Sequence, residues 1–411
     1  MARTKRNPCP EDECERTLRV RVRDKHIPWL RARARDVNFV WNYDQEVSLK
    51  VLAREGRFLS PEDLHEFTAG ATKAGLELHS QTVQAVNEEY VRRRIQFRAR
   101  RLRWRVSDRQ RSNYSLGWVP FKAVALQCRS KGVVRFMGQH IGFWDSYDLS
   151  QYHIRAGCFS EDARGRWYLN AVVRVKRAEK PAPAPTQDVG IDLGLKDLLA
   201  TSDGIKVEAP RFYRDLEGQL ASAQRAGKRD RVRAIHARIK HRRADHLHKL
   251  SRALVRDHDA IFVGNVNASA LAKTRLGKSV LDAGWSAFRT QLRYKCHQAR
   301  VVFEEVDEAG TTQTCSRCNS RTGPQGLEGL GIREWTCMEC GAVHDRDVNS
   351  ARLILAAGRR RLAEGILALP AKAAAEEAEG EEDVNSVPPA PYSLSGQYEA
   401  AAARGRDERR R

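Results

Sequence analysis

Two sets of side chains in this sequence have the types and spacing that bind metal ions. The first is the pattern C-x2-C-x18-C-x2-C, formed by Cys315, Cys318, Cys337 and Cys340. Two such pairs, each in a tight turn, bring four thiolates to the corners of a tetrahedron, which is the geometry that zinc prefers. Because sulfur fills all four positions, none is left open for chemistry. The pattern therefore predicts one structural Zn²⁺ ion.

The second set consists of aspartates. Asp345 and Asp347 follow the last cysteine pair and begin an amphipathic helix, and capping of that helix accounts for one of them. Asp192 interrupts the apolar run VGIDLG, where a buried carboxylate is costly unless it holds a cation or a strong hydrogen-bond donor. In two-metal nucleases, three or four carboxylates clamp two Mg²⁺ ions about 4 Å apart. Asp192 and Asp347 could supply two of these ligands.

The elements around these residues predict an α/β domain. Strands alternate with helices after residue 186, and two apolar strands are expected in AIFVGNV (260–266) and RVVFEEVDE (300–308). The basic stretch 214–258 is expected to form two helices that fold back on each other at Gly227. A linker rich in proline and alanine is expected at residues 180–186. On its N-terminal side, a helical region precedes several short strands that could close a small β-barrel.

The charge balance indicates a polyanionic partner. Lys and Arg number 73 against 52 Asp and Glu, a formal net charge of +21, and cationic side chains that neutralise phosphates release counterions. Candidate nucleic-acid-binding residues are Arg93, Arg94, Arg98, Lys240, Arg242 and Arg243. No apolar window reaches the ~18 residues of a membrane span. The sequence also begins without an apolar signal core. A cytoplasmic location is therefore expected.

The order of these motifs resembles the TnpB family, the transposon-encoded RNA-guided DNA endonucleases related to type V CRISPR effectors. The resemblance rests on VGIDLGLKDLLATSDG, RRADHLHKLSRALV, TTQTCSRCN and IREWTCMECGAVHDRDVNSARLIL. It implies an RNase H-like (RuvC) nuclease domain with an inserted zinc ribbon, and an N-terminal β-barrel (wedge) domain with an inserted helical recognition domain. The expected boundaries are 1–28 and 116–179 for the wedge, 29–115 for the helical domain, 180–186 for the linker, 187–308 and 342–366 for the nuclease, 309–341 for the zinc ribbon and 367–411 for a disordered tail.

The resemblance also implies partners and catalytic residues. The partners would be a guide RNA made from the transposon end and a double-stranded DNA target beside a short motif, with one protein monomer on each RNA. The protein would hydrolyse phosphodiester bonds with two Mg²⁺ ions. The resemblance further implies a prokaryotic protein that is nucleoid-associated when bound to DNA. Motif by motif, Asp192 corresponds to the first catalytic aspartate and Asp347 to the last, with Asp345 as the alternative to Asp347.

One position departs from the family. Most relatives carry a glutamate where this sequence has Gly264, at the end of the strand AIFVG. The carboxylate could come from the neighbouring strand, where Glu308 is preferred and Glu305 is the alternative. A second interpretation is a nuclease-inactive, RNA-guided repressor of transcription. A third is a transposon accessory protein that binds DNA through its zinc ribbon without RNA.

Overall fold

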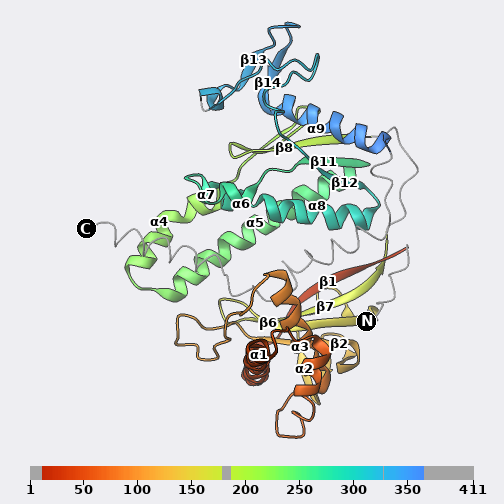
Figure 1. The fold of residues 1–411 in the computed structure, drawn as a ribbon, viewed down its shortest axis with the longest axis vertical. Coiled ribbons are helices and arrows are strands. Elements are labelled where there is room, and N and C mark those ends of the chain that lie inside the picture. Colours follow the sequence, from red (N-terminus) through yellow and green to blue (C-terminus); the bar gives the residue numbers. More distant parts are fainter. Residues whose placement is uncertain (1–11, 178–186, 327, 365–411) are drawn as a thin grey trace. The chain divides into compact units, whose positions relative to one another are not determined.

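The computed structural model describes residues 12–177, 187–326 and 328–364. The chain divides into two compact units, one that ends at Lys176 and one that begins at Arg177 (Figure 1). The predicted linker at 180–186 and the predicted disordered tail at 367–411 both lie outside the described residues. None of the helices in the described part of the chain combines the length and apolarity that crossing a bilayer requires.

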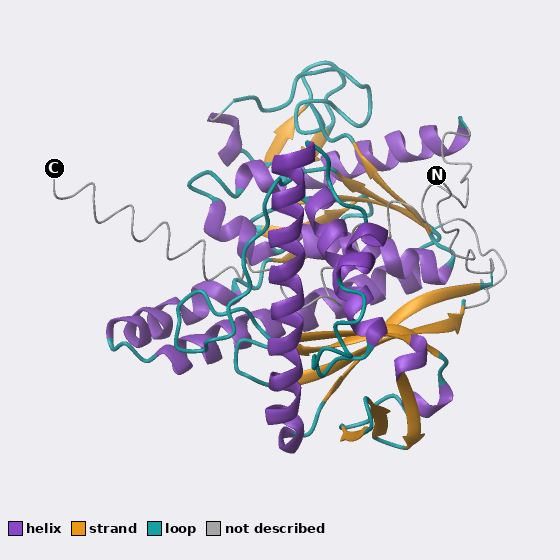
Figure 2. Ribbon diagram, turned by 60° about the horizontal axis from the view of Figure 1, so that its bottom comes forward, coloured by secondary structure: helices purple, strands orange, loops and turns teal. Residues whose placement is uncertain are grey.

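The described residues of the first unit form three α-helices and seven strands, and Figure 2 distinguishes helices from strands by colour. The helices are α1 (Ile27–Glu55), α2 (Pro61–Phe67) and α3 (Ser80–Gln96). The strands are β1 (Glu13–Arg21), β2 (Trp118–Lys122), β3 (Leu126–Ser130), β4 (Val133–Phe136), β5 (Gln139–Gly142), β6 (Ile154–Glu161) and β7 (Trp167–Lys176). All three helices lie between β1 and β2 in the chain.

The strands of this unit pair as two antiparallel sheets. Their orders are β1-β7-β6-β2 and β3-β4-β5, and a bridge between Val22 and Phe143 joins them. Hydrogen bonds between the described strands do not close the two sheets into one ring, so the wedge barrel stays a prediction. One hydrophobic core unites the helices with both sheets and includes Leu30, Phe136 and Phe159.

A polar group lies inside this core. Asp44 of α1 is fully buried, and neither of its carboxylate oxygens has a hydrogen-bond partner among the described residues. Burial raises the pKa of Asp44 to about 8. An isolated buried carboxylate is costly, so the folded chain keeps this side chain protonated.

This burial makes the stability of the first unit depend on pH. Between pH 4 and 8 folded Asp44 keeps a proton that the unfolded chain releases, so its contribution to the free energy of unfolding falls as the pH rises. Between pH 5 and 8 this contribution falls by about 4 kcal/mol, and Asp44→Asn should remove this pH dependence from the free energy of unfolding. Denaturant unfolding of both proteins at the two pH values measures the difference. An identical pH dependence in both would contradict the prediction.

The second unit contains the alternating strands and helices that the sequence predicts. Its strands are β8 (Asp188–Leu193), β9 (Asp197–Thr201), β10 (Lys206–Glu208), β11 (Ala260–Gly264), β12 (Val302–Val306), β13 (Glu334–Thr336) and β14 (Val343–Asp345). Its helices are α4 (Phe212–Arg225), α5 (Arg229–Asp257), α6 (Ala268–Leu271), α7 (Gly277–Ala283), α8 (Trp285–Ala299) and α9 (Arg346–Ala363). Helices α4 and α5 fold back on each other at Gly227, whose φ of 64° is left-handed, as predicted.

Five strands of this unit form a mixed sheet in the order β10-β9-β8-β11-β12. The meander β8-β9-β10 is antiparallel, whereas β11 runs parallel to both β8 and β12. Gly264 pairs with Val306, so the strand that could supply the missing carboxylate is the direct neighbour of β11, as expected. This mixed sheet with its helices agrees with the α/β domain that the sequence predicts.

Alternation along the strands assigns side chains to two faces of this sheet. Ile261 and Val263 of β11 join a core with α5 and α8, whereas Phe262 joins a core with Ile354 of α9. On β8, Val189 and Ile191 belong to the α5–α8 core. Because side chains alternate with a period of two, Gly190, Asp192 and Gly264 belong to the α9 face.

Two glycines let α9 approach the strands of the sheet closely. A Cβ added to Gly190 would overlap with the carbonyl oxygen of Ala351 and the backbone nitrogen of Leu355, both in α9. A Cβ added to Gly358 of α9 would overlap with the ring of Phe262. Figure 1 shows α9 lying across β8 and β11. The first turn of α9 is thereby fixed beside the end of β8, where Asp192 lies.

Candidate metal centres

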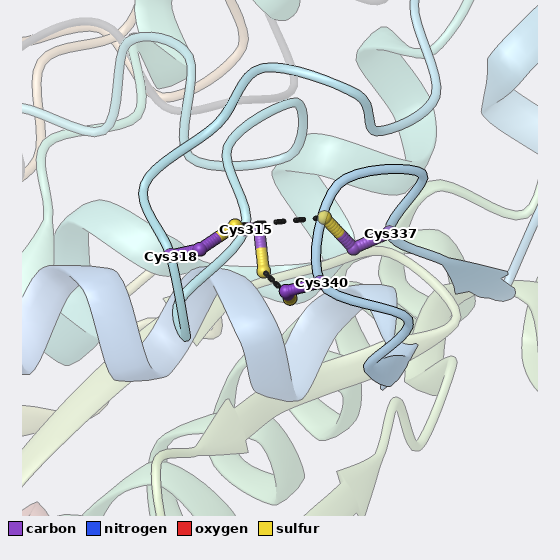
Figure 3. A group of neighbouring side chains, drawn as sticks. All are labelled: Cys315, Cys318, Cys337 and Cys340. Atoms are coloured by element: carbon purple, nitrogen blue, oxygen red, sulfur yellow. Dashed lines mark hydrogen bonds between the residues drawn. The ribbon is translucent and has the colours of Figure 1, made fainter.

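The four cysteines converge as their spacing predicts. Their sulfur atoms all lie within 4.8 Å of one another (Figure 3). Cys318 and Cys337 are 3.6 Å apart, and Cys315 and Cys340 are 3.7 Å apart, measured between Sγ atoms. Tetrahedral coordination with Zn–S bonds of about 2.3 Å requires sulfurs about 3.8 Å apart. The thiolates therefore fit a closed zinc site.

Neighbouring groups support this cluster and tie it to α9. Hydrogen bonds from the hydroxyls of Ser320 and Thr322 hold the pKa of Cys337 well below its usual range, which favours the thiolate. The buried side chain of Asn349 in α9 accepts a hydrogen bond from the backbone of Ser316 at 2.9 Å and donates one to the carbonyl of Thr314 at 2.7 Å. These hydrogen bonds therefore hold the loop of the first cysteine pair against α9, the helix that carries Asp347.

Removing one thiolate should empty this site. We expect about one zinc per chain in the native protein and much less in Cys337→Ser, because three sulfurs leave the tetrahedron open. Zinc released on denaturation, measured by atomic absorption, gives the ratio. Cys128→Ser, which changes an exposed cysteine outside the cluster, is the control and should keep its zinc. Equal zinc in both variants would show that the cysteine cluster is not the site.

A group of carboxylates meets where β8 ends beneath the start of α9. Burial, together with the charges of Glu308 and Asp347, raises the pKa of Asp192 to about 8. Burial also raises the pKa of Glu308. Carboxylates pushed toward their neutral forms by desolvation and by one another fit a site that takes up cations, because bound cations favour the ionised forms.

Glu308 occupies the space above Gly264. A Cβ added to Gly264 would overlap with Oε2 of Glu308, and the backbone N–H of Glu308 lies 3.4 Å from Oδ1 of Asn265. The side chain therefore reaches from just beyond β12 to the end of β11, on the α9 face. A glutamate on β11 itself would have to use the same space.

The alternative candidate, Glu305, points to the other face of the sheet. It forms ion pairs of 2.8 Å with Arg289 and 2.7 Å with Arg293, both on α8. Phe303 also packs into the core on the α8 side, whereas Val306 packs beside α9, as the alternation of side chains predicts. The structure places Glu305 away from the carboxylates around Asp192.

The two aspartates at the start of α9 have different environments. Oδ1 of Asp345 caps the helix by accepting from the N–H groups of Asp347 and Val348. The carboxylate of Asp347 lies 3.3 Å from Arg333, which stands between the two cysteine pairs in the chain, and 3.9 Å from Lys206 of β10. This arrangement agrees with the expectation that capping accounts for one aspartate, and it leaves Asp347 as the partner of Asp192.

Lys206 and Arg333 are two members of the site that sequence reasoning missed. Their positions in DGIKVE and GIREW follow no metal-ligand or phosphate-binding spacing. Among the described residues, the four cysteines are the one group of three or more potential ligands whose atoms all lie within 4.8 Å of one another. The carboxylates around Asp192 do not form such a compact group.

The predicted nucleic-acid-binding residues differ in how accessible they are. Arg94 is buried and donates to the carbonyl of Leu59, so its placement favours a structural role. Arg93 pairs with Glu89, and Arg243 donates to the carbonyl of Leu281 beside Asp282. Arg98, Lys240 and Arg242 are exposed. These three retain surface on which a phosphate could bind.

Comparisons with known protein families match the second unit. A family model described as "Probable transposase" matches residues 171–275, and one described as "Cas12f1-like, TNB domain" matches residues 285–354. The second range contains the cysteine cluster and Asp347.

Curated relatives are similar over about half of the chain. A Streptomyces pristinaespiralis protein named "Putative RNA-guided DNA endonuclease" is 38% identical over 48% of this chain and 52% of its own length. InsQ of Escherichia coli K12, of the same description, is 29% identical over 49% of this chain and 56% of its own. TnpB-like protein L79 of Acanthamoeba polyphaga mimivirus is 28% identical over 31% of this chain and 25% of its own. The chain thus spans about half the length of the first two relatives.

A solved structure has a similar fold. The Cas12f1 chain in a cryo-EM structure of a Cas12f1–sgRNA–target DNA complex superposes with a TM-score of 0.56 at 10% identity. The match covers 84% of this chain and 99% of the other. At this level of identity the likeness shows the fold alone.

Proposed function

The chain belongs to the TnpB family, and from this premise we propose that it is a transposon-encoded, RNA-guided DNA endonuclease. It would cleave double-stranded DNA beside a short adjacent motif, with base pairing to a guide RNA selecting the sequence. The reaction is hydrolysis of a phosphodiester bond.

The observation that carries the proposal is the position of Glu308. Its carboxylate lies in the space left open by Gly264 and acts electrostatically on Asp192. In a site that had lost its function, no selection would favour a carboxylate in this space. The glycine and the glutamate together support an exchange of positions within an active centre, in preference to the inactive repressor.

Asp192, Glu308 and Asp347 are the residues that would hold two Mg²⁺ ions. When bound, the ions supply an activated water and stabilise the leaving oxygen. Asp192 must give up the proton that its raised pKa retains near neutral pH, so ion binding should strengthen as the pH rises toward 8. Arg333 and Lys206 lie 3.3 Å and 3.9 Å from the carboxylate of Asp347 and place two positive charges beside it.

The basic surfaces would bind the nucleic acids. Arg98 in the first unit and Lys240 and Arg242 on the α4–α5 hairpin are exposed cations suited to phosphates. The zinc-binding segment would contact the target near the cleavage site, because its Arg333 already lies beside Asp347. One protein monomer on each RNA is the proposed assembly.

The test uses the full chain coexpressed with RNA transcribed from its own flanking DNA. The purified complex receives matched double-stranded DNA bearing a randomised adjacent motif, with Mg²⁺ or with EDTA. We expect cleavage that requires the guide match and Mg²⁺ and that disappears in Asp192→Asn. Guide-dependent binding without cleavage would instead establish the repressor. DNA binding by protein that carries no RNA would establish the accessory protein.

A further inference from the structure

Both carboxylate oxygens of Asp345 are engaged by donors of the chain itself. Oδ1 accepts from the N–H groups of Asp347 at 3.1 Å and Val348 at 3.0 Å. Oδ2 accepts from Nζ of Lys206 at 2.6 Å. The same ammonium group is 3.9 Å from Asp347. Two acids that lie two positions apart in the sequence are therefore held very differently.

We propose that Lys206 selects the metal ligand at the start of α9. By binding Asp345, it withholds that carboxylate from the metal ions and leaves Asp347 as the ligand that α9 contributes. The proposal rests on the proposed function, since it requires metal ions at Asp192, Glu308 and Asp347. Lys206 is a positioning residue, because its ammonium group contacts carboxylates of the chain and its effect passes through Asp345.

The fold gives Lys206 a defined place from which to act. It begins β10, the edge strand of the sheet, and pairs in register with Ala200 of β9. The ammonium lies among three carboxylates, with Asp197 at 4.0 Å in addition to the two on α9. Lys206 thus links the sheet that carries Asp192 to the N-cap residue of α9, Asp345, which is the closer of its two contacts on that helix.

Removing Lys206 would change the metal centre in two ways. Asp345 would keep its backbone hydrogen bonds through Oδ1 but would have Oδ2 free to bind a cation. The centre would also lose one positive charge, which by itself strengthens the binding of divalent cations. Cleavage of the DNA would then depend on a metal centre in which Asp345 is an incorrect ligand. The affinity of the centre for metal ions would not fall.

The first experiment separates catalysis from metal binding in the guide-loaded complex. Lys206→Met should cleave roughly 10–100-fold more slowly than wild type, as is typical for loss of an outer partner of a metal ligand. Its affinity for Mn²⁺, titrated by electron paramagnetic resonance, should not fall. Lys206→Arg, which keeps the charge and the donors, should restore most of the rate. Wild-type cleavage by Lys206→Met, or a parallel loss of rate and Mn²⁺ affinity, would overturn the proposal.

The second experiment tests whether Asp345 is the group withheld. Asp347→Asn should weaken Mn²⁺ binding, and adding Lys206→Met should recover roughly tenfold or more, because Asp345 becomes free to serve as a ligand. In the Asp345→Asn/Asp347→Asn background, where asparagine still caps the helix, Lys206→Met should recover little. Equal recovery in both backgrounds would mean that Lys206 acts through its charge alone, which contradicts ligand selection.

The two experiments also distinguish this proposal from the proposed function. If wild type neither cleaves nor binds Mn²⁺ in a manner that depends on Asp192, both proposals fall. If wild type does both and the Lys206 variants behave like wild type, the ligand-selection proposal alone is wrong.

Discussion

Glu308→Gln is expected to abolish guide-dependent cleavage while the protein keeps its fold and its nucleic acids. The substitution preserves the shape of a side chain that fills the space over Gly264 and removes the charge that faces Asp192. Loss of one metal-binding carboxylate removes several kcal/mol of transition-state stabilisation, which corresponds to a decrease in rate of about 100-fold or more. Single-turnover cleavage of matched DNA, with binding measured in parallel, gives the result.

Exchanging the two positions should restore activity. Gly264→Ala alone is expected to slow cleavage without unfolding the protein, because its Cβ meets the flexible end of Glu308 and displaces the carboxylate. Gly264→Glu combined with Glu308→Ala would return the carboxylate to β11, and we expect it to cleave faster than Glu308→Ala alone. Full activity in Glu308→Gln, or no difference between the double and the single variant, would contradict the exchange.

Glu305→Gln is the matched control for this series. Glu305 lies three residues before Glu308 but pairs with Arg289 and Arg293 on the opposite face of the sheet. Weakening these partly exposed ion pairs should cost about 1 kcal/mol of stability. Cleavage at a temperature where the variant stays folded should remain close to that of wild type.

Gly190→Ala is expected to have the largest effect on stability. An added Cβ overlaps with backbone atoms of α9, which cannot rotate away as a side chain could, so the helix must lift from the sheet. We expect a loss of about 3 kcal/mol or more in the free energy of unfolding. Cleavage should fall as well, because Asp347 moves with α9. Denaturant unfolding and cleavage assays together measure both effects.

A second glycine provides the comparison for Gly190. Gly218 is exposed on α4, and apart from its chain neighbours and the nearby backbone of that helix no atom lies within 4 Å of the position that its Cβ would occupy. Alanine is the better helix former by about 1 kcal/mol, so Gly218→Ala should stabilise the protein slightly and leave cleavage unchanged. Similar losses in both variants would show that α9 is not seated on β8 through Gly190.

Much of the second unit could be predicted because its patterns are local. The cysteine spacing, the apolar strands and the turn at Gly227 each depend on a few neighbouring residues. Alternation along RVVFEEV predicts Phe303 and Glu305 on one face and Val306 on the other, and the structure agrees. The contact between Glu308 and Gly264 depends on the register between β12 and β11. That register, in which Gly264 pairs with Val306, cannot be read from the sequence.

Other features depend on contacts between distant segments, which no local pattern encodes. Lys206 and Asp345 are 139 positions apart, and their contact arises because β10 and the cap of α9 meet at one edge of the sheet. Arg94 looks in sequence like its neighbours on α3, yet its guanidinium turns inward to Leu59. Burial of Asp44 likewise contradicts the ordinary preference of aspartate for the surface.

The hydrogen bonds of Asn349 have a consequence for protein engineering. Asn349 anchors the loop of the first cysteine pair only two positions beyond Asp347, so the cysteine cluster and the proposed nuclease centre share the first turn of α9. A replacement ribbon spliced in between residues 309 and 341 would have to supply the carbonyl of Thr314 and the N–H of Ser316 in the same places. Chimaeras that carry the whole stretch from 309 to 349 as one cassette should retain a correctly placed Asp347 more often than those joined within it.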